Sequence, residues 1–233
     1  MVLCPQNYIF AAYYPKKIFM HGQIIKNIIF DFGGVIIDID YWKSINAFIE
    51  LGGENFDRIY SQAGQTELFD ELDKGSIPAD EFINKLQKLF PPDVTTKMIN
   101  DAWNAILIGI PAHRIHLLEK IRNHYRIFLM SNTNTIHYTE YIKELRKKYG
   151  YESLSCLFEK VYLSFELGMR KPDEKFFKLI LEENNLNATE TLFIDDSEQN
   201  LPPAESFGIN TLFLKKGMDV TELFENGLLK TGK

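Results

Sequence analysis

Three aspartates directly follow apolar runs that are typical of buried strands. Asp31 follows one run, and Asp195 and Asp196 follow another. Because the carboxyl ends of parallel strands meet at one edge of a sheet, we expect these carboxylates to lie close together. Neighbouring carboxylates repel one another and shift one another's pKa values. A hard divalent cation relieves this repulsion, and Mg²⁺ prefers oxygen ligands. The sequence therefore predicts a magnesium site.

Two further polar positions suit the transfer of a phosphoryl group. Ser131 follows a third apolar run and offers a hydroxyl, and the backbone from Asn132 onward offers N–H donors. Lys171, in the loop at 168–173, supplies a compact positive charge for a phosphoryl oxygen or for Asp31. A carboxylate can attack phosphorus and form an aspartyl-phosphate, so that catalysis rests on positioning and charge stabilisation. Each residue alone would be a turn or cap residue, but together they predict a phosphohydrolase.

Apolar runs and helical patterns alternate along most of the chain. The run at 24–30 is almost continuously apolar, as in a parallel strand buried on both faces. After Pro111, strand-like runs alternate with amphipathic helical segments. This alternation predicts an α/β fold with a doubly wound parallel sheet. The later strands are expected at 127–130, 161–163, 191–194 and 211–214.

Residues 41–110 have helical character throughout, and no strong strand is expected among them. An insertion that leaves from the end of the first strand would cover the crevice where ligands bind. Trp42 and Trp103 are expected in the core of this insertion. We expect an N-terminal extension at 1–23, an α/β core at 24–40 and 111–233, and a small helical cap domain at 41–110, inserted after the first strand.

Other titratable side chains have ordinary expected places. The acidic residues Glu67, Asp70, Glu71 and Asp73 are expected on a solvated helix face. Arg170 either helps to hold phosphate or forms a surface ion pair. Surface positions are expected for the histidines, with one of them at most reaching the cap interface. These are His21, His113, His116, His124 and His137.

Composition excludes several classes of partner. The formal net charge is −6, so no basic excess is available to bind nucleic acid. No apolar run approaches the roughly 20 residues that a membrane-spanning helix needs. Cys4 and Cys156 belong to no metal-binding pattern and are expected to be free thiols in a reducing, cytoplasmic compartment. A small anionic substrate remains possible, because the local field of a pocket need not follow the net charge.

Four segments, in this order, resemble the motifs of the haloacid dehalogenase superfamily, whose members are mostly phosphatases. They are Ile-Ile-Phe-Asp-Phe-Gly-Gly-Val at 28–35, Leu-Met-Ser-Asn at 129–132, Lys-Pro-Asp at 171–173, and Phe-Ile-Asp-Asp at 193–196 with Asn200. The resemblance extends from about residue 24 to residue 214. The helical insertion after the first motif is similar to the family's cap of the first type.

The resemblance implies a role for each motif residue. Asp31 would be the nucleophile, and Lys171 would stabilise both the phosphate and Asp31. Ser131 and the backbone of Asn132 would hold the phosphate. The implied ligands of Mg²⁺ are Asp31, the carbonyl of Gly33, Asp195 directly, and Asp196 directly or through water.

One position departs from the family pattern. Family phosphatases usually carry a second aspartate two residues after the nucleophile as general acid and base, but this chain has Gly33 there. Three consequences are open. In the first, the leaving group needs little protonation, as with an anomeric sugar oxygen. In the second, Asp38 or Asp40 replaces the general acid, unless both lie in a charged hinge. In the third, the protein is a weak or inactive phosphate-binding module.

Two further comparisons concern the substrate. Segments 31–40 and 162–172 resemble the α-D-glucose-1-phosphate phosphatase subgroup, which also has glycine at that position. The resemblance therefore implies a sugar phosphate such as glucose-1-phosphate. The alternative enzyme class is a hydrolytic haloacid-type dehalogenase, which uses the same aspartate without a metal. The acidic pair Asp195 and Asp196 argues against that alternative.

Overall fold

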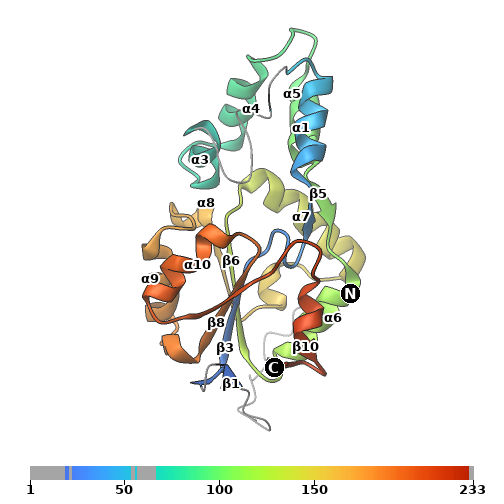
Figure 1. The fold of residues 1–233 in the computed structure, drawn as a ribbon. Coiled ribbons are helices and arrows are strands. Elements are labelled where there is room, and N and C mark those ends of the chain that lie inside the picture. Colours follow the sequence, from blue (N-terminus) through green and yellow to red (C-terminus); the bar gives the residue numbers. More distant parts are fainter. Residues whose placement is uncertain (1–18, 21–22, 54–55, 57–66, 231–233) are drawn as a thin grey trace.

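The core of the molecule is a parallel sheet of five strands. The computed structural model describes residues 19–20, 23–53, 56 and 67–230 (Figure 1). The strand order is β7-β6-β3-β8-β9, and every neighbouring pair is parallel. The first strand of this sheet along the chain, β3, is therefore the central one, and the later strands add on both sides of it. This arrangement confirms the predicted fold class. The strands are β3 (Asn27–Phe30), β6 (Arg126–Ser131), β7 (Lys160–Leu163), β8 (Thr191–Asp195) and β9 (Asn210–Phe213).

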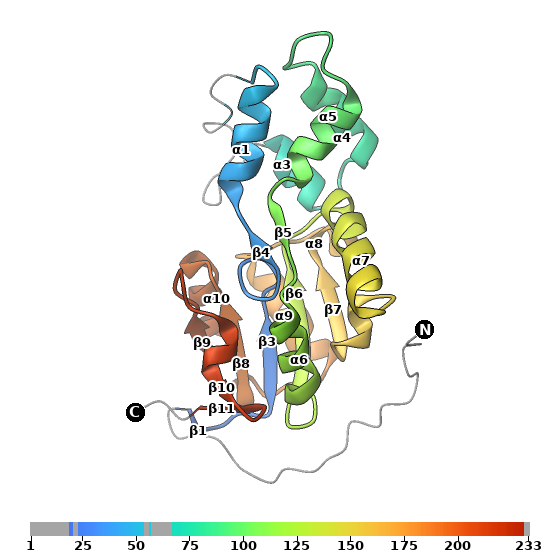
Figure 2. The ribbon, with the colours of Figure 1, turned by 90° about the vertical axis from the view of Figure 1, so that its right-hand side faces the viewer.

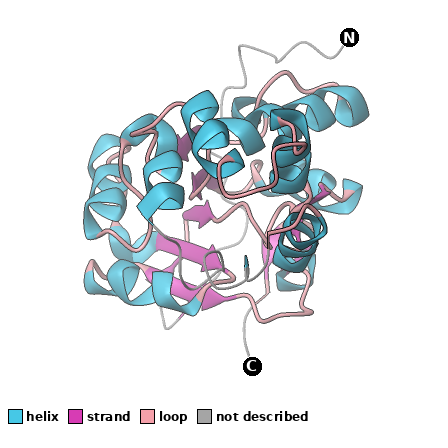
Figure 3. Cartoon of the chain, turned by 90° about the horizontal axis from the view of Figure 1, so that it is seen from above, coloured by secondary structure: helices cyan, strands magenta, loops and turns pink. Residues whose placement is uncertain are grey.

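Helices cover both faces of this sheet, and the strands lie between them when the molecule is viewed from above (Figure 3). Ile28 packs in one apolar cluster with Leu118 and Leu145, on the helices α6 (Ala112–Ile121) and α7 (Thr135–Tyr149). Ile29 points to the opposite face and packs with residues of α9 (Glu174–Glu183) and α10 (Leu201–Ser206). Burial on both faces explains why the first strand is almost continuously apolar.

The first strand is shorter than predicted. Residues 24–30 form two strands, because β2 (Gln23–Ile24) pairs antiparallel with β1 (Phe19–Met20) before β3 begins at Asn27. Most of the predicted extension at 1–23 lies outside the described residues. The remaining elements of the core are α8 (Ser164–Leu167), β10 (Phe224–Glu225), β11 (Leu228–Leu229), and the 3₁₀ turns Leu154–Cys156, Ala188–Glu190, Glu198–Asn200 and Val220–Leu223.

Four described helices form a separate apolar cluster above the sheet (Figure 1). Their aromatic side chains pack together, with the rings of Phe69 and Trp103 stacked at a centroid distance of 5.3 Å. Trp103 is therefore a core residue, as predicted. Trp42 is not, because it points away from the buried face of its helix and is 63% exposed. The helices are α1 (Tyr41–Glu50), α3 (Glu67–Asp73), α4 (Ala79–Gln87) and α5 (Thr96–Asn104).

A two-stranded ribbon connects the helical part to the sheet (Figure 2). Its strands β4 (Asp38–Ile39) and β5 (Leu107–Gly109) pair antiparallel. The expectation of no strand within 41–110 is thus corrected by β5, which is too short to show a period in the sequence. The ribbon leaves β3 at the edge where Asp31 lies, so the helices stand over the carboxyl ends of the strands.

Two expectations drawn from composition have separate outcomes. Cys156 is buried and does not carry a free thiol, contrary to the prediction, and Cys4 lies outside the described residues. The cytoplasmic location inferred from free thiols thus loses that support and stays a prediction. None of the helices in the described part of the chain combines the length and apolar character that a membrane span requires.

Candidate active site

Three carboxylates meet at the carboxyl edge of the sheet. Asp31 follows β3, and Asp195 ends the neighbouring strand β8, with Asp196 directly after it. Each of the three offers an oxygen, and these oxygens lie within 4.8 Å of one another. The structure therefore brings together the three residues that the sequence placed at one edge.

Lys171 is the positive charge of this cluster. Its Nζ donates to Asp31 Oδ1 at 2.6 Å and to Asp195 Oδ2 at 2.7 Å, and the residue is 2% exposed. Asn132 holds the lysine's backbone from both sides, because its Nδ2 donates to the carbonyl of Lys171 at 2.9 Å and its Oδ1 accepts from the N–H at 2.8 Å. The family resemblance implies only a backbone role for Asn132, whereas its side chain also positions the loop that carries Lys171.

The electrostatics of the cluster are dominated by burial. Burial raises the pKa of Asp31 to about 8; Lys171 opposes that rise, and Asp195 and Asp196 add to it. Burial, reinforced by Asp195, likewise raises the pKa of Asp196 to about 6. Burial alone would lower the pKa of Lys171, but the Asp195 and Asp31 carboxylates outweigh it and hold that pKa above its usual value. The protein alone therefore supplies too little positive charge for three ionised carboxylates.

This donor set fits a magnesium ion. Buried carboxylate oxygens on a rigid sheet edge are hard ligands, and a divalent cation would supply the missing charge. The residues that would hold it are Asp31, Asp195 and Asp196, together with the carbonyl of Gly33 in the turn after β3.

Neighbouring groups hold the carboxylates of Asp195 and Asp196 in position. Asp195 Oδ1 accepts from the backbone N–H of Ser197 at 2.7 Å, and both its oxygens accept from Asn200 Nδ2. Asp196 packs on Gly34, where an added Cβ would lie only 2.1 Å from Asp196 Oδ2 and where φ is +70°. Gly34 is thus required for the close approach, and the double glycine in the sequence was the available signal.

Gly33 lies against the connecting ribbon. A Cβ at this position would meet Ile39 Cδ1 at 3.2 Å, so a side chain here would press on β4. The two nearby aspartates both have partners outside the pocket. Asp38 Oδ1 pairs with Arg114 Nη1 at 2.8 Å, and Asp40 caps α1 by accepting from the N–H of Trp42. Neither of them lines the pocket, which favours the expectation of a charged hinge over a role as the acid.

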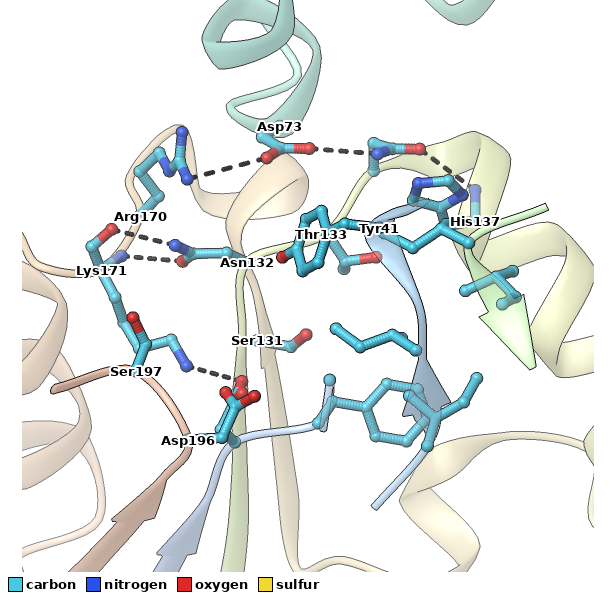
Figure 4. Close-up of a pocket in the computed structure, with 18 of the residues that line it drawn as sticks. Tyr41, Asp73, Ser131, Asn132, Thr133, His137, Arg170, Lys171, Asp196 and Ser197 are labelled. Carbon is cyan, nitrogen blue, oxygen red and sulfur yellow. Dashed lines mark hydrogen bonds and ion pairs between the residues drawn. The ribbon is translucent and has the colours of Figure 1, made fainter. Parts of the chain in front are cut away.

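One pocket joins this cluster to the helical part of the molecule. Its lower end holds Ser131, 2% exposed, beside Asp196 and Lys171 (Figure 4). Its volume is about 110 Å³. The upper wall contains Arg170, for which phosphate binding was one of two expectations, and polar groups that the sequence did not assign to a site, which are Tyr41, Asp73, Thr133, Asn134 and His137.

Asp73 and Arg170 do not lie on the solvated surface, which was the expectation for Asp73 and one of two expectations for Arg170. Asp73 is 6% exposed, and its Oδ1 accepts from Asn134 Nδ2 at 3.1 Å. Arg170 Nη1 donates to Asp70 Oδ1 at 3.0 Å, and its Nη2 lies 3.9 Å from Asp73 Oδ2. The ion pair expected of Arg170 therefore exists, but it joins the loop before Lys171 to the cap helix α3. Only the approach of two distant segments buries Asp73, so the helical pattern could not reveal it.

His137 also lies at the cap interface and not on the surface. Its ring stacks on Trp103 at a centroid distance of 4.8 Å, and its Nδ1 is 3.0 Å from Asn104 Oδ1. Burial lowers the pKa of His137 to about 3. The imidazole is therefore neutral at neutral pH and joins the core to α5 by stacking on Trp103 and by its contact with Asn104.

This burial predicts a pH-dependent stability. The pKa of His137 is about 3 when folded and about 6.5 when unfolded, so the unfolded chain binds more protons between these values. The stabilisation is complete above the unfolded pKa and is lost as the pH falls towards the folded one. From about pH 7 to about pH 5, the free energy of unfolding should drop by about 2 kcal/mol from this group.

Urea denaturation of wild type and His137→Asn at both pH values measures the contribution of His137 to the free energy of unfolding. The difference between the two pH values should shrink by that amount in His137→Asn. The exposed His116→Gln should keep the wild-type difference. Equal pH dependence in wild type and His137→Asn contradicts the burial argument.

The comparisons with known proteins agree with this geometry. The haloacid dehalogenase-like hydrolase family model matches residues 25–208. A D-ribitol-5-phosphate phosphatase from Bacteroides thetaiotaomicron is 33% identical over 196 residues, which cover 84% of this chain and 95% of that protein.

Two solved structures are similar over most of the chain. The HAD family enzyme BT-2542 from Bacteroides thetaiotaomicron, in complex with magnesium and inorganic phosphate, is 37% identical with a TM-score of 0.75, covering 86% of this chain and 100% of that one. A HAD-like family hydrolase from Porphyromonas gingivalis is 32% identical with a TM-score of 0.71, covering 83% and 93%. This chain therefore belongs to the haloacid dehalogenase-like hydrolase family.

Proposed function

We propose that this hydrolase is a magnesium-dependent phosphatase that attacks a small phosphorylated metabolite with the carboxylate of Asp31. One observation carries the proposal: Asp31 lies in a pocket where Lys171, Asp195 and Asp196 surround it with the charges that phosphoryl transfer needs. The relatives named as a phosphatase and crystallised with magnesium and phosphate support it. In this proposal residues 41–110 form a cap domain over the core of 24–40 and 111–233.

The residues divide the reaction between them. An oxygen of Asp31 attacks phosphorus, the bond from phosphorus to the leaving oxygen breaks, that oxygen takes a proton from solvent, and an aspartyl-phosphate forms. Water then attacks that phosphorus and loses a proton to solvent, and the bond from phosphorus to the Asp31 oxygen breaks, which releases phosphate and free Asp31. Lys171 orients the nucleophile by binding Oδ1, while Ser131 and the backbone of Asn132 hold the phosphoryl oxygens. When bound, the magnesium ion neutralises charge on the phosphate and on the three carboxylates.

Several observations favour a small phosphorylated polyol or sugar as substrate. The pocket of about 110 Å³ is well below the ~300 to 1,000 Å³ that is usual for drug-sized ligands. A relative acts on D-ribitol-5-phosphate, according to its name. With Gly33 at the general-acid position and with Asp38 and Asp40 outside the pocket, substrates with good leaving groups are also favoured, glucose-1-phosphate among them.

The test is phosphate release from a panel that includes D-ribitol-5-phosphate, glucose-1-phosphate, pentose phosphates and nucleotides, with Mg²⁺ or with EDTA. We expect turnover only with Mg²⁺ and fastest on one polyol or sugar phosphate. Binding of phosphate with Mg²⁺ but no turnover on any substrate would identify a phosphate-binding module instead. Halide release from 2-haloacids in EDTA would favour the dehalogenase alternative. That alternative needs no metal and therefore does not account for the acidic pair Asp195 and Asp196.

A further inference from the structure

The upper wall of the pocket carries a buried carboxylate that the hydrolytic steps do not use. Asp73 is the last residue of α3 in the cap and lines the same pocket as Asp31 and Lys171. Figure 4 shows Asp73 across the cavity from Ser131 and Asp196. A phosphate bound at Asp31 and Ser131 would therefore direct its leaving group towards Asp73.

The position of Asp73 is unfavourable for a carboxylate by itself. The C-terminal end of a helix carries partial negative charge, which disfavours an anion there. Burial adds a desolvation cost, which a carboxylate offsets only through charged or hydrogen-bonding partners. Asn134 Nδ2 at 3.1 Å and the guanidinium of Arg170 at 3.9 Å hold the carboxylate in place. The result is a fixed acceptor at the end of the pocket remote from the phosphate site.

We propose that Asp73 is a substrate-binding residue that accepts hydrogen bonds from hydroxyl groups of the leaving group. The inference rests on the proposed function in one respect, that phosphate binds at the Asp31 end. A carboxylate offers two acceptor oxygens and no donor, so it matches O–H groups. An apolar leaving group of equal length would remove water from Asp73 and return no hydrogen bond, which is how a polar site rejects an apolar analogue. The site therefore selects polyhydroxylated phosphates.

A second role for Asp73 would be to hold the cap against the core through Arg170. Asp70 provides the matched control, because it lies on the same helix and pairs with the same guanidinium at 3.0 Å. Asp70 is not among the residues that line the pocket. Substitution of Asp70 therefore weakens the contact between cap and core without removing an acceptor from the substrate.

Calorimetric binding in saturating Mg²⁺ separates these roles. The probes are D-ribitol-5-phosphate and n-pentyl phosphate, which has the same chain length and no hydroxyls. All proteins carry Asp31→Asn to block hydrolysis, alone or combined with Asp73→Asn or with Asp70→Asn. We expect Asp73→Asn to weaken ribitol-5-phosphate binding by about 10- to 100-fold and pentyl phosphate binding by less than about 3-fold. Asp70→Asn should alter both affinities by a similar, small factor.

The alternative outcomes are distinct. Equal weakening of both phosphates by Asp73→Asn, or the same selectivity change in Asp70→Asn, assigns Asp73 to the cap contact and overturns the inference. Failure of the Asp31→Asn protein to bind either phosphate removes the phosphate site and overturns it as well. Because binding needs no turnover, a wild type that hydrolyses nothing contradicts the proposed function alone and leaves this result standing.

Discussion

Replacing Asp31 with asparagine is expected to lower kcat by roughly 10⁴-fold or more on every phosphate substrate, because the reaction loses its nucleophile. Asparagine keeps the size of the side chain and an oxygen that Lys171 can still bind. The neutral amide is a poor nucleophile and cannot form the aspartyl-phosphate. Phosphate release, with single turnovers monitored in Mg²⁺, measures the effect.

The loss should not reflect unfolding. Burial raises the pKa of Asp31 to about 8, so the folded protein without metal disfavours a charge there at neutral pH. For an acid whose folded pKa is raised, stability falls as the pH rises through the window between the unfolded and the folded value. Removing the charge therefore leaves metal-free Asp31→Asn at least as stable as wild type in urea denaturation.

Asp38→Asn is the matched control for the nucleophile. This aspartate is seven residues further along the chain, is paired with Arg114, and lies outside the pocket. It should keep kcat within about 3-fold of wild type, since it lies outside the pocket and Arg114 keeps its second partner, Asp219. A large loss in Asp38→Asn would revive its role as a replacement for the missing acid. Residual turnover of a few per cent in Asp31→Asn would show that another group attacks phosphorus.

The sequence predicted the sheet and the lower half of the site because both depend on local signals. A strand buried on both faces must be apolar along its middle, and β3, β6 and β8 are apolar at 28–30, 127–130 and 192–194. Parallel pairing then brings the residues after these strands to one edge, whatever the loops between them do. Asp31, Ser131 and Asp195 could thus be grouped without any knowledge of the packing.

The upper half of the site could not be predicted in the same way. Asp73 ends a helix whose other acidic residues are partly or fully exposed, and nothing in its pattern marks the one that Arg170 and Asn134 cover. His137 lies one turn after a helix cap, at a position that becomes buried only where Trp103 of the cap stacks on it. Both positions depend on how the cap rests on the core, which is a tertiary property.

The same limit explains the error at Trp42. A tryptophan beside an apolar stripe is usually buried, but the face of α1 that packs against α5 is set by Ile45 and Phe48. Trp42, the second residue of the helix, lies on another side and is exposed. The apolar pattern of a short helix defines the direction of its buried face only roughly, and packing against the neighbouring helix determines which border residues are buried.

The second large effect is expected at Lys171. Lys171→Met keeps the length of the side chain but removes the charge that Asp31 and Asp195 share at 2.6 and 2.7 Å. Breaking one side of a buried ion pair typically costs about 3 to 5 kcal/mol, because the partner stays buried without its counter-charge. In the metal-free protein that partner is chiefly Asp195, since a charge on Asp31 is already disfavoured. We expect that loss in the free energy of unfolding in EDTA, and a fall in kcat of roughly 10²- to 10³-fold in Mg²⁺.

Two dependences distinguish this explanation from a simple packing defect. Mg²⁺ should restore more stability to Lys171→Met than it adds to wild type, because a cation bound by the carboxylates replaces the missing positive charge. In EDTA the destabilisation should shrink as the pH falls, since carboxyls whose folded pKa is raised take up protons more readily in the folded state than in the unfolded one. Urea denaturation with and without Mg²⁺ at several pH values tests both. A deficit that neither Mg²⁺ nor acid reduces would mean that Lys171 stabilises the site by its volume, and its charge would then not be what holds Asp31 in place.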